Sequence, residues 1–176
     1  MSDAPFAVEA FTATFERLRL PIGLQVQTLT LTGQGVQIGT DPVSIKLDGA
    51  GRFEAVVDAA SIIDFLTAKA PGGLKDFEVS LTEGKINVKA VLKILVELRA
   101  AAVCRLVIRE KRQLWVELES ADVGTVGAKS LIKGQIDQLN PIFDAKELPL
   151  PSSLETVAVE DGLIRLSGTV SPPLTG

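Results

Sequence analysis

The chain has 176 residues, of which 46% are hydrophobic, 23% are charged and 5% are aromatic, and its formal net charge is −4. The length predicts one domain with a substantial core, and the mean hydropathy of +0.30 excludes a disordered chain. No basic run extends beyond residues 109–112, which include Glu110, so the cationic surface that nucleic-acid binding needs is missing.

Histidine is absent, and cysteine occurs once, at Cys104. The sequence therefore excludes a histidine-based catalytic triad, an internal disulfide and a cysteine zinc site. Cys104 lies in an apolar run, which predicts a buried small hydrophobe. The neighbouring carboxylates Glu117, Glu119 and Asp122 are predicted to be solvated charges rather than an acid–base pair. We expect no enzyme, no cofactor and no metal site, although catalysis by carboxylates or lysine remains chemically allowed.

The N-terminal residues 1–5 have neither the basic nor the apolar region of a signal peptide. The most apolar stretch, residues 91–108, is interrupted by four charged residues, so it does not predict a membrane span. We therefore expect a cytoplasmic protein, peripheral to the membrane where it meets one. A cell-envelope location is expected instead if the sequence lacks part of its natural N-terminus.

Three segments have apolar residues at helical spacing: residues 5–18, 58–70 and 128–140. The second has Asp58 as its predicted N-cap, and Pro141 ends the third. The remaining segments alternate in the manner of β-strands. They are residues 24–32, 36–38, 43–47, 52–57, 77–82, 113–119, 156–160 and 163–168.

The longest alternating signal covers residues 85–108, where every even position is apolar and many odd positions are charged. This pattern predicts one apolar and one solvated sheet face. A single strand of this length would extend about 80 Å, so we expect a bend or hairpin near residues 97–101. The exposed cations on this stretch, Lys85, Lys89, Lys93, Arg99 and Arg105, are predicted to be solvated, with contact to anionic lipid head groups as the alternative.

A supersecondary unit recurs near residues 21–38, 58–96 and 128–169, as a Pro-x-x-Leu step, a strand, a turn with glycine and a second strand. Gly33–Gly35 and Gly49–Gly51 are predicted hairpin turns rather than nucleotide-binding loops. The segment 124–130 lacks the Gly-Lys-Ser/Thr step of a phosphate loop and is predicted to begin the third helix.

These elements predict an α+β fold in which a long, highly curved antiparallel sheet wraps around amphipathic helices. Two interpretations remain open: the helices fill the interior completely, or they leave a groove for acyl chains. Ala90, Ala100, Ala102 and Cys104 favour the groove because small residues leave room against the sheet.

The chain contains Leu139–Asn140–Pro141, a Leu-Pro-x-x-Leu-x-x-Val-x-Val-x-x-Gly-Leu pattern at residues 150–163, and the predicted helix Ser61–Leu66 followed by Pro71. In these motifs and in the order of elements from residue 20 to 169, it resembles the LmeA-like bacterial lipid-binding proteins of the tubular lipid-binding (TULIP-like) superfamily. The resemblance implies a curved sheet around a long helix, with an apolar groove for a phospholipid or similar amphiphile. It brings no catalytic residue.

The favoured hypothesis is therefore non-catalytic binding or transfer of a lipid, with transient membrane-surface contact and no nucleic acid. The alternative is a structural or interaction module with a filled core that pairs through a sheet edge, as a homodimer. The predicted groove lining comprises Ile86, Val88, Leu92, Ile94, Val96, Leu98, Leu106, Ile108, Leu114, Val116, Ile62, Leu66, Leu131 and Ile136.

Overall fold

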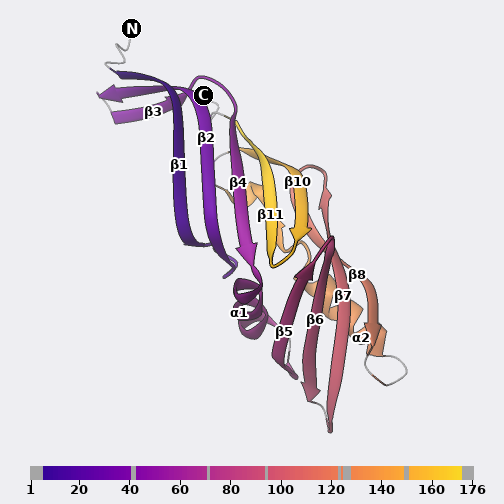
Figure 1. The fold of residues 1–176 in the computed structure, drawn as a ribbon. Coiled ribbons are helices and arrows are strands. Elements are labelled where there is room, and N and C mark those ends of the chain that lie inside the picture. Colours follow the sequence, from indigo (N-terminus) through magenta and orange to yellow (C-terminus); the bar gives the residue numbers. More distant parts are fainter. Residues whose placement is uncertain are drawn as a thin grey trace.

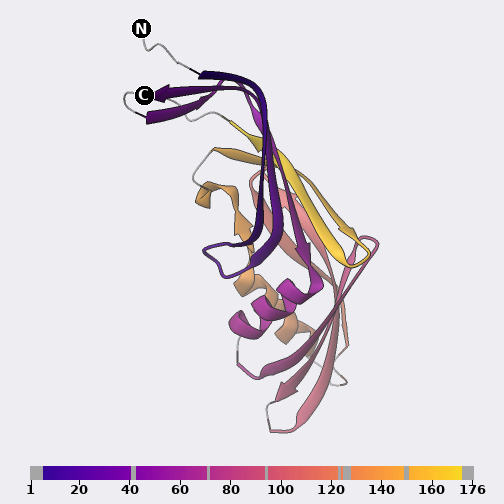
Figure 2. The same cartoon turned by 60° about the vertical axis from the view of Figure 1, so that its left-hand side comes forward.

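The computed structural model describes residues 6–40, 43–70, 72–93, 95–122, 124, 128–148 and 151–171. These residues form two antiparallel sheets and two α-helices, which confirms the predicted α+β class with a curved antiparallel architecture. The two sheets follow each other along an elongated molecule (Figure 1). Figure 2 shows that both helices lie on the same side of the sheets. In the described part of the chain, no helix is long and apolar enough to cross a membrane.

The first sheet has the strand order β1-β2-β4-β11-β10, and β3 pairs with the far end of β2. It joins the N-terminal part of the chain to the C-terminal hairpin, because β11 pairs with β4 along its whole length. Its strands are β1 (Phe6–Arg19), β2 (Gln25–Thr40), β3 (Val43–Leu47), β4 (Gly51–Asp58), β10 (Ser152–Glu160) and β11 (Leu163–Val170).

The second sheet has the sequential order β5-β6-β7-β8-β9. From β5 to β8 each strand pairs with the next one in the chain through a short connection, whereas β9 pairs with β8 only after the chain has passed through α2. Its strands are β5 (Leu74–Thr82), β6 (Lys85–Lys93), β7 (Glu97–Arg109), β8 (Gln113–Asp122) and β9 (Phe143–Asp144), and the 3₁₀-helix η1 (Ala145–Glu147) follows.

The connection between β6 and β7 keeps the apolar stripe in phase. Lys93 pairs with Glu97 and Leu92 with Leu98, so each even residue of β6 faces an even residue of β7. A three-residue connection therefore places the apolar residues of both strands on one sheet face. The hairpin lies at residues 94–96, just before the predicted bend at 97–101.

The helices α1 (Ala59–Lys69) and α2 (Ala128–Leu139) are held at one end by side-chain hydrogen bonds. Asp58 caps α1 by accepting a hydrogen bond from the Ser61 backbone N–H at 2.8 Å, as the sequence predicts. After α2, the Asn140 side chain accepts a hydrogen bond from the Val116 N–H and donates one to the Val116 carbonyl. This pair attaches the end of α2 to β8.

The two sheets contact each other through backbone hydrogen bonds and shared apolar clusters. Gly84 in the β5–β6 turn donates to the Val159 carbonyl at 2.9 Å, and Gly162 in the β10–β11 turn donates to the Leu81 carbonyl at 3.1 Å. Beside these bonds, Leu81 and Cys104 of the second sheet pack in one cluster with Val159 of the first. Because both backbone and core cross the junction, the sheets form one continuous curved layer.

The prediction of a helix at residues 5–18 is wrong, because this segment is β1. Its apolar spacing fits a helix, but it also fits a strand, since Phe11, Ala13 and Phe15 alternate with Thr12 and Thr14. β-branched and aromatic residues favour strands, and pairing with the whole of β2 decides between the two patterns. The first repeated unit is consequently preceded by a strand rather than by a helix.

The predicted hairpin turn at Gly33–Gly35 is also wrong, since β2 runs through it. Gly35 has a φ of 72°, which bends the strand without reversing it, and its carbonyl accepts a hydrogen bond from the Asp48 N–H at 2.7 Å. A positive φ of this kind is open to glycine at little cost. The predicted strands 24–32 and 36–38 are therefore one bent strand.

Candidate functional site

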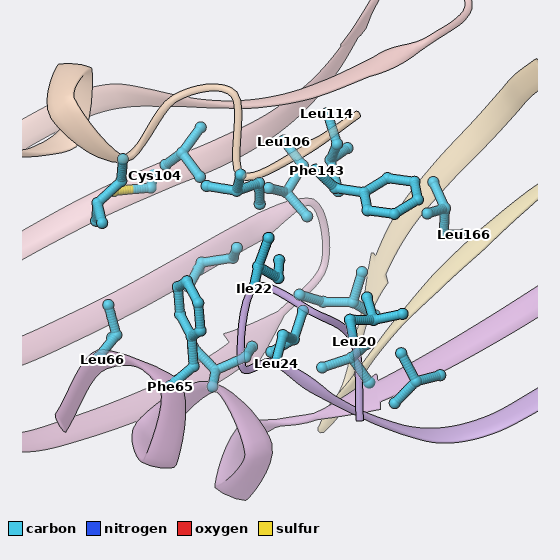
Figure 3. A pocket seen from close by; sticks show the side chains of 18 of the residues that line it. Leu20, Ile22, Leu24, Phe65, Leu66, Cys104, Leu106, Leu114, Phe143 and Leu166 are labelled. Carbon is cyan, nitrogen blue, oxygen red and sulfur yellow. The ribbon is translucent and has the colours of Figure 1, made fainter. Parts of the chain in front are cut away.

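An apolar cavity of about 330 Å³ lies between the two sheets and the helices. Its wall takes residues from both sheets, from both helices and from the connection between β1 and β2. The first sheet contributes Leu31, Phe53 and Leu166, among others, and the second contributes Leu106 and Leu114. Figure 3 shows side chains from these elements facing a common space.

The helices close part of the cavity with their apolar sides. Ile62, Phe65 and Leu66 of α1 lie at helical spacing and reach the cavity, as do Ile132 and Ile136 of α2. The charged and polar residues Asp64, Thr67 and Lys69 occupy other positions of α1, so the helix turns an apolar side to the cavity and carries its charges elsewhere. The helices therefore contribute to the wall and leave the interior unfilled.

The connection between β1 and β2, residues 20–24, is turned inward. The side chains of Leu20, Ile22 and Leu24 project toward the middle of the cavity (Figure 3). The Leu20 N–H donates to the Leu24 carbonyl and the Gly23 N–H donates to the Leu20 carbonyl, both at 2.9 Å. Gly23 has a φ of 95°, which other residues rarely adopt. These bonds form a compact apolar turn, hereafter the inward connection.

The cavity wall carries no charged side chain among the described residues. Only Gln135 and Ser152 bring polar side chains to it. A cavity lined in this way binds water poorly, because water needs several polar partners. An apolar ligand gains free energy from the same wall, at roughly 0.8 kcal/mol for each methylene buried. The wall is therefore suited to hydrocarbon.

Cys104 lies in this wall on β7 and is 4% exposed, which confirms the prediction of a buried residue. Burial, with a smaller effect from the charge of Glu119, raises the pKa of its thiol from 9.0 to about 11. The thiol is therefore neutral near pH 7, whereas nucleophilic attack needs the thiolate.

The carboxylates near the end of β8 lie on the outer side and take part in ion pairs. Glu117 is held by Arg105 at 2.6 Å and by Arg109 at 3.2 Å, and their hydrogen bonds lower the pKa of Glu117. Glu119 lies 3.5 Å from Lys85. None of these carboxylates reaches the cavity. Within the described ranges, no group of three or more acidic or cysteine residues could hold a metal ion.

Eight of the predicted groove residues lie in the cavity wall, and five others among the described residues do not. Leu92 and Leu98 pack in a separate core cluster, and Ile108 packs against the core cluster that contains Leu154. Val96 and Leu131 are exposed, and Ile94 lies outside the described residues. The eight in the wall are Ile62, Leu66, Ile86, Val88, Leu106, Leu114, Val116 and Ile136. That they contact a ligand remains a prediction.

The sequence prediction missed the wall formed by the first sheet and by the inward connection. The first sheet gave a usable signal, because Leu29 and Leu31 alternate on β2 and Phe53, Ala55 and Val57 alternate on β4. Nothing local identified these strands as the opposite wall of the same space, because that depends on the β4–β11 pairing between distant parts of the chain.

Two curved sheets and two helices, in the part of the chain that the structure describes, define an α+β protein with an internal apolar cavity. The family model for LmeA-like phospholipid-binding proteins matches residues 7–169, nearly the whole chain. The chain belongs to this family. No curated protein and no solved structure matches it.

Proposed function

We propose that this protein binds a phospholipid by taking its acyl chains into the cavity, and transfers the lipid without changing it chemically. The observation that carries the proposal is the uncharged apolar wall, contributed by both sheets and both helices. The volume of about 330 Å³ lies within the range of about 300–1,000 Å³ usual for ligand sites. Membership of a phospholipid-binding family supports the same ligand class.

Binding energy in such a site comes from the hydrocarbon. Ten buried methylenes would contribute roughly 8 kcal/mol before the cost of immobilising the lipid. A charged head group would lose its hydration against this wall, so we expect the head group at the solvent-facing opening. The same wall supports binding without a chemical change, because it offers a neutral thiol and no described carboxylate, lysine or arginine.

Filling the cavity with a side chain tests the proposal. Ala102 lies in the wall, whereas Ala10 is exposed on β1. Ala102→Trp is expected to weaken binding of a fluorescent fatty acid by about tenfold or more, because the indole occupies space that the acyl chain needs. Ala10→Trp adds the same side chain outside the cavity and should leave affinity unchanged. Equal affinity for all three proteins would contradict the proposal, provided that both variants unfold cooperatively.

A second candidate is a homodimer formed through the edge of the first sheet. The edge strand β1 has 14 residues, and Phe6 and Val8 on it are 62% and 39% exposed. An exposed apolar edge of this length can pair with a second chain. Light scattering after size exclusion would show a dimer that Phe6→Lys converts to a monomer. A wild-type monomer at all concentrations would exclude this candidate.

A further inference from the structure

We infer that the hairpin tip between β6 and β7 docks this protein on anionic bilayer surfaces. The membrane-docking tip is defined here as Lys93, Leu95, Val96 and Arg99. Its use in loading the cavity with lipid rests on the function proposed above, whereas docking itself does not.

The tip exposes aliphatic side chains that nothing in the described structure covers. Leu95 is 97% exposed and Val96 is 63% exposed. Two other exposed hairpin turns are polar, with Glu83 beside Gly84 and Asp161 beside Gly162. Solvent-exposed turns favour polar residues and glycine, so two adjacent aliphatic residues at a hairpin tip need a physical reason.

Cations without acidic partners flank these two residues. Glu97, the one acid at the tip, is held by Lys75 of β5 at 2.8 Å. Lys93 and Arg99 are exposed and make no ion pair with any residue in the described ranges. The chain as a whole has a net charge of −4, so this local excess of positive charge is set against an acidic background. Anionic lipid surfaces attract such cations by about 1 kcal/mol each.

The tip lies at one extreme of the molecule. Figure 1 shows that the β6–β7 hairpin reaches beyond the other strands, at the end opposite to β3. A convex tip with two aliphatic residues offers too little area for a stable protein interface, which needs about 800 Å² from each partner. It suits a bilayer, where Leu and Val enter the interface while Lys and Arg remain among the head groups.

One part of the cavity wall approaches the tip along the second sheet. Directly behind the tip, Leu92 and Ala100 form a core cluster against which Leu74 and Ile132 pack. Ala100, Leu74 and Ile132 also line the cavity. A bilayer in contact with the tip would therefore adjoin elements that enclose the apolar space.

The test is co-sedimentation of the full chain with vesicles of phosphatidylcholine and phosphatidylglycerol. The double variant Leu95→Asp/Val96→Asp is expected to lower the partition coefficient by about tenfold or more, since it removes the apolar insertion. The variant Lys93→Glu/Arg99→Glu is expected to lower partitioning on these vesicles and to have little effect on pure phosphatidylcholine. Salt should weaken wild-type binding to the anionic vesicles.

Matched controls alter equivalent residues away from the tip. Val8→Asp introduces an acid at an exposed aliphatic position of β1, and Lys111→Glu reverses an exposed charge in the β7–β8 turn. Both should partition like the wild type. A Leu95→Trp variant reports insertion directly, because its emission should shift to the blue on the anionic vesicles.

The outcomes separate this inference from the proposed function. The inference is wrong if the wild type does not bind anionic vesicles, or if the tip variants bind them as well as the wild type. This holds even if the protein itself carries phospholipid. If the tip variants lose vesicle binding while the controls keep it, the inference stands, even if mass spectrometry finds no lipid in the protein. In that last case only the proposed function fails.

Discussion

Two connections in this protein are rich in aliphatic residues, and they have opposite environments. The inward connection between β1 and β2 places Leu20, Ile22 and Leu24 inside the cavity. The β6–β7 connection holds Leu95 and Val96 out in solvent at the end of the molecule. The comparison shows that a hydrophobic loop acquires its role from what the fold places beside it. The first completes the wall of a site, and the second is left available to an external surface.

An acidic substitution should separate the two connections most strongly. Ile22→Asp puts a carboxylate against a wall with no charged partner, so the free energy of unfolding should fall by about 3 kcal/mol or more. Urea denaturation followed by the fluorescence of Trp115 measures this change. A loss below about 1 kcal/mol would mean that the inward connection can move out of the cavity at little cost in free energy. The two connections would then not differ in environment.

The exclusion of water from the cavity wall should be measurable through the pH dependence that Cys104 gives to stability. Folding raises the pKa of this thiol from 9.0 to about 11, so its contribution to stability is complete below pH 9 and is lost as the pH rises toward 11. The free energy of unfolding should fall by about 2–3 kcal/mol across this window, because one pKa unit corresponds to about 1.4 kcal/mol. The Cys104→Ala variant should lack this component. Parallel pH profiles of the two proteins would show that the thiol is solvated.

The start of β2, just after the inward connection, is linked to the start of α1. Gln27 donates a hydrogen bond to Asp58 at 2.5 Å, and Asp58 caps α1. Asp58→Ala should lower the free energy of unfolding by about 1 kcal/mol, and Asp58→Asn should retain most of it because asparagine also caps helices. Thermal unfolding checks both variants. An equal loss for Asn and Ala would show that charge rather than capping matters.

The carboxyl of Asp58 also makes the free energy of unfolding depend on pH, with a sign opposite to the effect of Cys104. Burial raises the pKa of Asp58, but hydrogen bonds from Ser61 and Gln27 outweigh this effect and hold it below its ordinary value of 3.8. Its contribution is present above that value and is lost as the pH falls through the lowered pKa. Asp58→Asn should remove this acid-sensitive part.

The smallest effect is expected at the tip. Leu95→Asp alone should change the free energy of unfolding by no more than about 0.5 kcal/mol, because the side chain is already 97% exposed. Together with the large loss at Ile22, this result would sharpen the comparison in a single assay. A substantial loss at Leu95 would instead indicate that the tip packs against part of the protein in solution.

Local pattern was sufficient to predict much of this fold. The even-position stripe of residues 86–108 gave two strands with one apolar face, and Asp58 marked the start of α1 correctly. The N-terminal segment failed because Ala7, Phe11, Phe15 and Leu18 satisfy helical spacing while the same segment also alternates, and only pairing with β2 resolves the choice.

The candidate site was harder to predict than the elements that build it. Sequence reasoning assigned the groove to the second sheet and the two helices, and the structure places a further part of the cavity wall on the first sheet and the inward connection. Two aliphatic connections that look alike in sequence cannot be assigned inside or outside without the long-range pairing that curves the sheets around the helices. Leu92 and Leu98 show the same limit. They lie on the apolar sheet face that the alternation predicts, but they pack in a core cluster with Leu74 and Ile132 instead of lining the cavity.

The central claim, that the cavity holds phospholipid, is tested most directly by native mass spectrometry of the protein purified from its own host, followed by solvent extraction. The account predicts an adduct with the mass of a phospholipid, released intact on extraction and reduced in Ala102→Trp but not in Ala10→Trp. A bare protein mass that persists after incubation with phospholipid vesicles would contradict it and would favour the filled-core interaction module.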